Sequence, residues 1–320
     1  MCLLVAALVA LSGCGRVGYG LDERVADGGP DDAPARDAAA DASGAADAGP
    51  LDAGPPDAGP PGFYALDWDP PSEVPGVDAL DRCNRDPVLT PDERFMFLTR
   101  AGTAGGNCYA MDPVNHTFEW AGGAPTELGR LPDLDPTSNA EHNLHPIVGP
   151  TGVRLFVTTQ DWDVWAIDLD AAPPFDVAGP PVDVGINTGL IEADATTTSD
   201  GSRLVFVRDA ELYETTATPG TLDFGGPVAR AELNSTAQES DPALSPDGRV
   251  IVFTRTGASN DLWIARRLDP ADPFEPPERM SDVFNTTGYE SDAFITASGD
   301  LLYIRETPAG SRVHFARARM

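Results

Sequence analysis

A unit of about 50 residues recurs five times along the chain, and this repeat limits the fold more than any other feature. Each copy begins at an anchor residue, continues into an apolar run, and ends in a segment with a Trp, Tyr or His near its middle. The anchors are Asp86, His145, Asp194, Asp241 and Asp292, spaced by 59, 49, 47 and 51 residues. Tandem units of this length form propellers or solenoids, because each unit buries its apolar face against the next.

Two alternate columns of each copy are apolar, which is the pattern of a β-strand with one face on a core. The first column holds Met96, Leu155, Leu204, Ile251 and Leu302, and the second, two residues later, holds Leu98, Val157, Phe206, Phe253 and Ile304. A turn such as Asp247-Gly248 precedes the run, as in a strand that leaves a hairpin. Three strands per copy, with a fourth in the Pro-rich interval that follows, predict a propeller blade.

The best-formed copy resembles a known family. The run Asp241-Pro242-Ala243-Leu244-Ser245-Pro246-Asp247-Gly248, followed by the aromatic segment 261–265, is similar to the Pro-Asp (WD40-like) repeat of TolB-like β-propellers. The resemblance spans about residues 62–320. It implies a β-propeller in a periplasmic or surface setting. Members of this family mostly bind proteins or peptides and share no single activity.

The anchors predict an all-β propeller of five four-stranded blades, with six blades as the alternative if the long 86–145 interval contains one more. The sequence ends just after the third strand of the last copy, which leaves that blade without an outer strand. We expect residues 66–78 to supply this strand and close the ring, because an open sheet edge would invite aggregation.

The first residues look like an export signal. Leu3 to Leu11 form an apolar run as long as a signal-peptide core and too short to span a bilayer. The next residues, Leu11-Ser12-Gly13-Cys14, resemble the bacterial lipobox. That resemblance implies a lipoprotein signal peptide over 1–13 and acyl chains such as palmitate on Cys14. The alternative is a plain secretory signal with an incidental Cys. We expect lipid anchoring in the bacterial cell envelope, at the outer membrane, on the periplasmic face or the cell surface.

Residues 14–61 are predicted to be the lipidated Cys14 followed by a disordered tether. Ala, Asp, Gly and Pro fill 37 of the 47 positions from Gly15 to Pro61, and Asp-Ala-Gly-Pro recurs at 47, 52 and 57. Such a segment cannot bury enough apolar surface to offset its ordering entropy. A flexible chain of this length spans roughly 35–40 Å, so it acts as a spacer for a propeller domain over 62–320.

Charge excludes some classes of partner. The chain carries 51 Asp and Glu against 21 Arg and no Lys, a formal charge of −30. Nucleic-acid binding needs a basic face, and so does adhesion to anionic lipid by charge alone. We therefore predict no nucleic-acid partner, and contact with the bilayer only through the acyl chains of Cys14.

Two cysteines remain after Cys2 in the signal and Cys14 are set aside. Cys83 and Cys108 are an even pair in an exported protein, and a disulfide between them is the prediction. Free buried thiols and a metal pair are the alternatives. The only close His pair, His142 and His145, lacks the spacing of a zinc site on a helix.

At three of the anchors a Glu stands two residues before the anchor Asp, and these acids form the candidate ligand ring. Its members are Glu192, Asp194, Glu239, Asp241, Glu290 and Asp292. In a propeller these positions surround one mouth of the central channel. One interpretation is structural, with the Asp carboxylates accepting hydrogen bonds from turn N–H groups of neighbouring strands and the Glu side chains solvated. The other is a negative ring that attracts a basic partner or a cation, for which Ca²⁺ suits carboxylates better than zinc.

No nucleophile motif or phosphate loop is present in the sequence. Two functions follow. The first is a membrane-anchored recognition or scaffold lipoprotein that binds a protein or peptide, such as a basic one, through a propeller face. It performs no catalysis and, unless the acidic ring binds Ca²⁺, needs no cofactor. The alternative is a glycosidase-like enzyme that uses two channel-mouth carboxylates about 5–10 Å apart.

Overall fold

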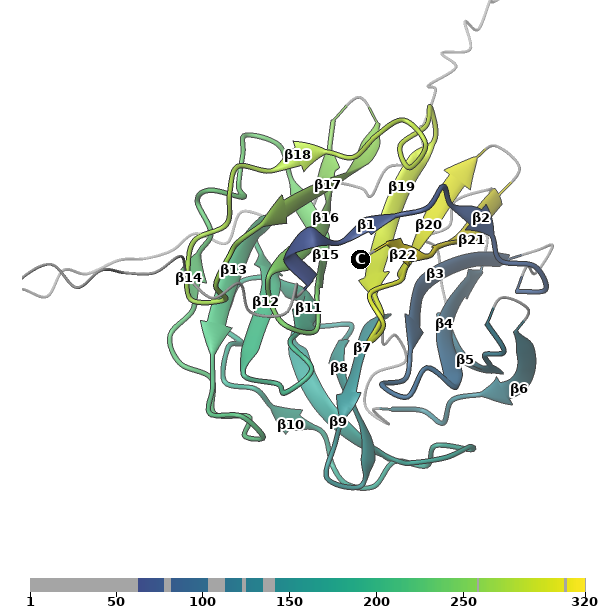
Figure 1. The fold of residues 1–320 in the computed structure, drawn as a ribbon. Helices are drawn as coiled ribbons and strands as arrows, with labels where there is room; N and C mark the ends of the chain where they lie inside the picture. The colour runs from purple at the N-terminus through teal and green to yellow at the C-terminus, as the bar shows by residue number, and fades with distance from the viewer. Residues whose placement is uncertain are drawn as a thin grey trace, which may run out of the picture. The chain divides into compact units, whose positions relative to one another are not determined.

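The computed structural model of the protein describes residues 63–77, 82–102, 113–122, 125–134, 142–257, 259–307 and 310–319. These residues form five four-stranded antiparallel blades around a central channel, with one inner strand from each blade (Figure 1). The prediction of an all-β propeller with five blades is confirmed. Cys14 and the predicted tether lie outside the described residues. No helix in the described ranges is long and apolar enough to cross a membrane.

The strands follow the same order in every blade, from the channel outwards. Blade 1 holds β3 (Arg82–Leu89), β4 (Phe95–Gly102), β5 (Val114–Glu119) and β6 (Thr126–Arg130). Blade 2 holds β7 (His142–Val148), β8 (Gly152–Thr158), β9 (Val164–Asp170) and β10 (Val182–Asp183). Blade 3 holds β11 (Glu192–Thr197), β12 (Arg203–Arg208), β13 (Glu211–Thr216) and β14 (Val228–Ala229). Blade 4 holds β15 (Glu239–Leu244), β16 (Val250–Thr256), β17 (Asn260–Arg266) and β18 (Glu278–Arg279).

Blade 5 is built from both ends of the described chain. Its strands are β19 (Tyr289–Ile295), β20 (Leu301–Thr307), β21 (Gly310–Ala316) and, as the outer strand, β2 (Ser72–Glu73). A short helix, η1 (Phe63–Ala65), leads into β1 (Asp67–Trp68), which pairs with β22 (Ala318–Arg319). The buried Trp68 donates a hydrogen bond from Nε1 to the carbonyl of Gly299 at 2.8 Å. The prediction that residues 66–78 close the last blade is therefore confirmed.

The apolar core lies between neighbouring blades, and the two columns predicted from the repeat belong to it. None of those ten side chains exposes more than 1% of its surface. Contacts between blades follow from the same pattern: Phe175, which follows β9, packs edge-to-face against Phe95 and Phe97 of β4 with ring centroids 5.2 and 5.1 Å apart. Burial of one such aromatic ring stabilises the fold by about 3 kcal/mol.

Each inner strand contains a β-bulge at the same position, and this position corrects one anchor. The first bulge residue has φ between 49° and 54° in all five blades; these residues are Asp86, Asn143, Asp194, Asp241 and Asp292. Asp and Asn tolerate this left-handed conformation better than other residues with a side chain. Choosing His145 as the second anchor was therefore wrong, because Asn143 holds that position. The sequence contained the signal, since Glu141 precedes Asn143 by two residues as Glu192 precedes Asp194.

The closing strand gives a first testable expectation. Deleting residues 15–61 should leave the melting temperature unchanged, because the described blades and the ribbon of β1 and β22 stay intact. Deleting residues 15–75 removes β1, β2 and the buried Leu66 and Trp68, and should cost about 3–5 kcal/mol. Thermal melts followed by circular dichroism compare the two. Equal melting temperatures would show that the ring does not depend on this strand.

Candidate functional site: an aspartate pocket in the channel

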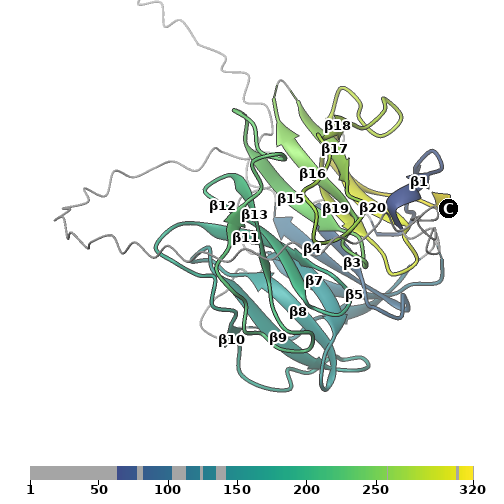
Figure 2. The ribbon, with the colours of Figure 1, turned by 60° about the vertical axis from the view of Figure 1, so that its left-hand side comes forward.

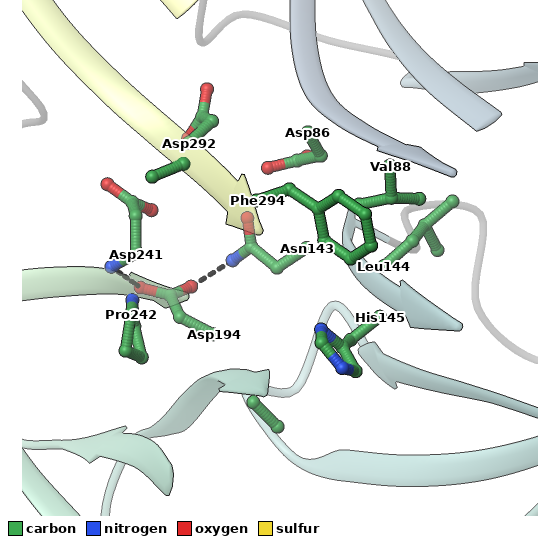
Figure 3. A pocket seen from close by; sticks show the side chains of 12 residues that line it. Asp86, Val88, Asn143, Leu144, His145, Asp194, Asp241, Pro242, Asp292 and Phe294 are labelled. Carbon is green, nitrogen blue, oxygen red and sulfur yellow. Dashed lines mark hydrogen bonds between the residues drawn. The ribbon is translucent and has the colours of Figure 1, made fainter. Parts of the chain in front are cut away.

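The five bulges direct their side chains to one small pocket in the channel. Asp86, Asn143, Asp194, Asp241 and Asp292 all line it, one from each blade (Figure 3). The pocket has a volume of about 30 Å³. A cavity needs about 10–15 Å³ to hold a water molecule, so this one has room for two waters, a metal ion or one cationic head group.

Hydrogen bonds join the pocket residues of three consecutive blades. The Nδ2 group of Asn143 donates to Oδ1 of Asp194, and the backbone N–H of Asp241 donates to Oδ2 of Asp194 at 3.2 Å. Asp194 thus connects blades 2, 3 and 4. The structural interpretation expected a turn N–H as the donor, whereas the donor here is the bulge residue of the neighbouring inner strand. The carboxylate of Asp194 therefore holds neighbouring blades together and also contributes negative charge to the pocket.

Arg85 connects the first blade to the last at the same level. Its Nε lies 3.4 Å from Oδ2 of Asp292, and its Nη1 lies 3.0 Å from Oε1 of Glu306 on β20. Burial raises the pKa of Glu306; the Arg85 guanidinium acts against this rise, and the negative charge of Asp241 adds to it. Arg85 thus places a positive charge between the carboxylates of Asp292 and Glu306.

Two side chains fill the channel next to the pocket. His145 of blade 2 and Phe294 of blade 5 meet edge-to-face with ring centroids 5.5 Å apart, although their blades are not neighbours. Both follow the bulges along their strands, so the channel is filled towards the ends of the inner strands. The aspartates of the pocket stand nearer the start of their strands than this filled part of the channel does.

His145 is a buried neutral side chain. Its Nε2 lies 3.2 Å from the Thr197 carbonyl and its Nδ1 lies 3.3 Å from the Thr196 hydroxyl. Burial lowers its pKa to about 4. Both ring nitrogens are used inside the protein, and the His142 side chain lies outside the described residues, so the structure supplies no support for a metal bound by this pair.

The glutamates of the predicted ring do not line the pocket. Glu192, Glu239 and Glu290 are fully buried, and each forms an ion pair with the Arg opposite it on the second strand of its own blade. The distances from Oε1 to Nε are 2.7 Å to Arg208, 2.9 Å to Arg255 and 3.0 Å to Arg305. The structure thus brings together the aspartates of the predicted ring and separates the glutamates, which are buried rather than solvated.

A second motif, not recognised in the sequence, supports each glutamate. The pair Asn-Thr or Asn-Ser stands four to five residues before it, at Asn187-Thr188, Asn234-Ser235 and Asn285-Thr286. The hydroxyl donates to the Glu carboxylate at 2.6–2.7 Å. The Asn amide accepts from, and donates to, one backbone residue of the third strand of the preceding blade. The signal was present as a recurrence of Asn-Thr/Ser-x-x-x-Glu in three copies.

The remaining predicted residues stay predictions. Cys83 is disulfide-bonded, whereas its predicted partner Cys108 lies outside the described residues. Cys14 lies outside them as well. Among the described side chains, no group of three or more His, Cys, Asp or Glu is arranged to hold a metal ion. Calcium binding by the aspartates is an expectation that the structure does not test.

Comparisons with known proteins identify the fold and no family. No protein-family model matches the sequence, and no curated protein matches it. The similar solved structures include a putative TolB from Agrobacterium tumefaciens, with 13% identity over 74% of this chain and 80% of that one and a TM-score of 0.44.

Two glycoside hydrolase structures are also similar in fold. A GH43B protein of a Bacteroides ovatus xyloglucan locus shares 13% identity over 78% of this chain, with a TM-score of 0.53. The match covers 54% of that longer chain. A putative glycoside hydrolase from Parabacteroides distasonis shares 11% identity over 78% of this chain and 95% of that one, with a TM-score of 0.52. At these identities the likeness is one of fold alone.

The buried histidines predict an acid-sensitive fold. Burial lowers the pKa of both His145 and His314 to about 4, so between pH 6.5 and 4 the unfolded chain binds protons that the folded chain does not. Stability should therefore fall as pH drops through this window, by up to about 3 kcal/mol per histidine. Urea unfolding from pH 7.5 to 4 measures it. The variants His145→Gln and His314→Gln should each show a shallower pH dependence; unchanged slopes in both would contradict the assignment.

Proposed function

We propose that this protein is a lipid-anchored recognition protein of the bacterial cell envelope that binds a basic protein or peptide at the channel mouth and performs no catalysis. One observation carries the proposal: four aspartates line a pocket of only about 30 Å³. Pockets that bind small molecules measure about 300–1,000 Å³. The aspartate pocket therefore suits one cationic head group, such as an ammonium, better than a whole substrate.

The charge balance of the propeller supports a basic partner. Residues 62–320 contain 41 acidic side chains and 18 Arg. Many of these Arg are already paired inside the fold, as Arg208, Arg255 and Arg305 are with their buried glutamates. The uncompensated charge is therefore acidic. An acidic surface steers a basic partner and raises its association rate.

The glycosidase alternative receives no specific support from the site. Such an enzyme needs two carboxylates about 5–10 Å apart with a sugar ring between them. The aspartates come together in a pocket that is about a tenth of the smallest ligand-binding size. Likeness to glycoside hydrolases at 11–13% identity supplies the fold only.

The first described residue, Phe63, contacts the propeller beyond the end of an inner strand. The backbone N–H of Phe63 donates to Oδ2 of Asp247, in the turn that follows the inner strand β15. The aspartate that the same strand contributes to the pocket, Asp241, stands near the start of β15. Figure 2 shows β1 and the C-terminus on the same side of the propeller. Phe63 thus contacts the propeller beyond the end of β15, whereas Asp241 stands near the start of that strand.

The anchor is tested by one substitution. Cys14→Ser removes the thiol that the lipobox resemblance marks for acylation, and should leave a soluble or unprocessed precursor without lipid labelling. Membrane fractions washed with alkali, together with incorporation of labelled palmitate, measure this. Equal retention of the wild-type protein and the variant in the washed membranes would refute lipid anchoring at Cys14.

The acidic mouth is tested with charge-matched variants. The triple variant Asp86→Asn, Asp241→Asn and Asp292→Asn removes three pocket charges. A control triple at the exposed Asp133, Asp176 and Asp223 removes the same charge elsewhere. Detergent-solubilised full-length protein is used to capture envelope proteins at low salt, with quantification by mass spectrometry. A basic protein or peptide should be retained by the wild type and the control and lost with the pocket variant.

Equal capture by all three forms would contradict binding at the mouth. A repeat with a calcium chelator distinguishes the two kinds of contact. Capture that survives the chelator indicates a cationic side chain in the pocket, and capture that the chelator abolishes indicates a calcium ion between the pocket and the partner.

A further inference from the structure

A larger groove lies on the opposite face, at the boundary between blades 3 and 4. The turns after β11 and β15 form its floor, Phe63 stands at its side, and Ser199, Asp200, Ser202 and Arg203 line it. Its volume is about 390 Å³. This lies within the range of pockets that bind small molecules, unlike the aspartate pocket of the channel.

The floor of the groove is held by side-chain hydrogen bonds within each turn. The Thr198 hydroxyl donates to Asp200 at 2.7 Å, and the Ser245 hydroxyl donates to Asp247 at 2.8 Å. The two turns are also joined, because the N–H of Ser199 donates to the Pro246 carbonyl at 3.0 Å. A ligand would therefore find the floor already in place, without an ordering cost.

Phe63 forms a fixed aromatic wall. Its backbone N–H is bound to Asp247 at 3.1 Å. Its ring packs over Gly299, where an added Cβ would lie 2.9 Å from Cε1 of the ring. The ring is thus held between the turn of blade 5 and the groove. An aromatic face of this kind packs against the apolar C–H face of a sugar ring.

The polar groups of the groove combine donors and acceptors. Ser199 and Asp200 are exposed and Ser202 is half-buried. Arg203 is held by Glu214, which accepts from its Nη1 at 3.2 Å. Hydroxyl, carboxylate and guanidinium groups together can bind a ligand whose groups both donate and accept hydrogen bonds.

Charge and backbone pairing narrow the class of ligand. Asp247 pairs with Arg249 at 3.8 Å, and the groove also contains Arg203, which is itself paired with Glu214, so charge alone does not select a cationic ligand. A peptide would pair with free backbone groups, but the N–H groups of Ser199, Gly201 and Gly248 already donate within the turns. We propose that this groove binds a neutral oligosaccharide, with one sugar ring against Phe63 and its hydroxyls on Ser199, Asp200 and Arg203. This site does not depend on the proposed function of the acidic mouth.

Calorimetric titration of the full-length protein in detergent tests the proposal. Four neutral probes are used: cellotetraose, xylotetraose, chitotetraose and galactotetraose. At least one should bind with saturation below about 10 mM. Phe63→Leu keeps an apolar side chain and loses the aromatic face, and Asp200→Asn loses an acceptor; each should weaken binding about tenfold, or 1.4 kcal/mol. Ser199→Trp, at an exposed position, should block the groove.

The control variant is Asp92→Asn. Asp92 accepts from Thr90 and from the N–H of Arg94 in blade 1, as Asp200 accepts from Thr198 and the N–H of Ser202, but it lies outside the groove. It should bind the sugar like the wild type. The proposal is overturned if none of the four probes saturates, if Phe63→Leu, Asp200→Asn and Ser199→Trp all leave binding unchanged, or if Asp92→Asn weakens it as much as Asp200→Asn does.

Discussion

Closure of the ring is the constraint on which the rest of this structure depends. A blade buries its apolar faces only against its two neighbours, so five blades in an open row would expose the faces at both ends. Here the outer strand of blade 5 comes from residues before blade 1, and Arg85 of blade 1 reaches Asp292 and Glu306 of blade 5. Backbone pairing closes the outer edge, and the ion pairs close the channel side.

The β-bulge of the inner strands separates two kinds of acid that stand close together in sequence. Glu192 and Asp194 are two residues apart, and in a regular strand both would point to the same face. The bulge at Asp194 changes this direction, so the aspartate enters the pocket while the glutamate turns to Arg208 within its blade. The same change occurs at Asp241 and Asp292. In blades 3, 4 and 5 the channel pocket thus receives one carboxylate from each inner strand and not two.

The sequence predicted what depends on local periodicity. The two apolar columns, the blade count and the closing strand follow from spacing, and all were confirmed. The choice of His145 over Asn143 was wrong because the anchor is defined by a backbone conformation with a positive φ. Asp and Asn both adopt this conformation, and a comparison of residue types alone does not show it. Neither interpretation of the glutamates, in solvent or in the channel-mouth ring, included their ion pairs, because the Arg that binds each of them lies about 16 residues away on another strand. The groove at Phe63 was not predictable, since it joins segments from residue 63 to residue 270 that only the closed ring brings together.

The buried Glu–Arg pairs contribute more to the correct register of the strands than to the free energy of unfolding. If two neighbouring strands shift by two residues, their apolar side chains still face the same side. Hydrophobic burial alone therefore penalises such a shift of register only weakly. A slip would leave a buried Glu opposite a residue other than its Arg, and an uncompensated buried charge costs about 3–5 kcal/mol. The pair therefore fixes the register of the first two strands in blades 3, 4 and 5.

Blade 1 departs from this pattern where it meets the closing segment. Asn84 stands in the place of the glutamate, opposite Arg100. Arg100 instead binds Glu127 on the outer strand at 3.0 Å and donates from Nη2 to the Val77 carbonyl at 2.8 Å. In blades 3, 4 and 5 the corresponding arginine also donates to a carbonyl of the segment before its inner strand, and in blade 1 that segment is the chain that comes from β2. Blade 1 thus takes this contact from the residues that follow the closing strand β2, while its pair with Glu127 stays within the blade.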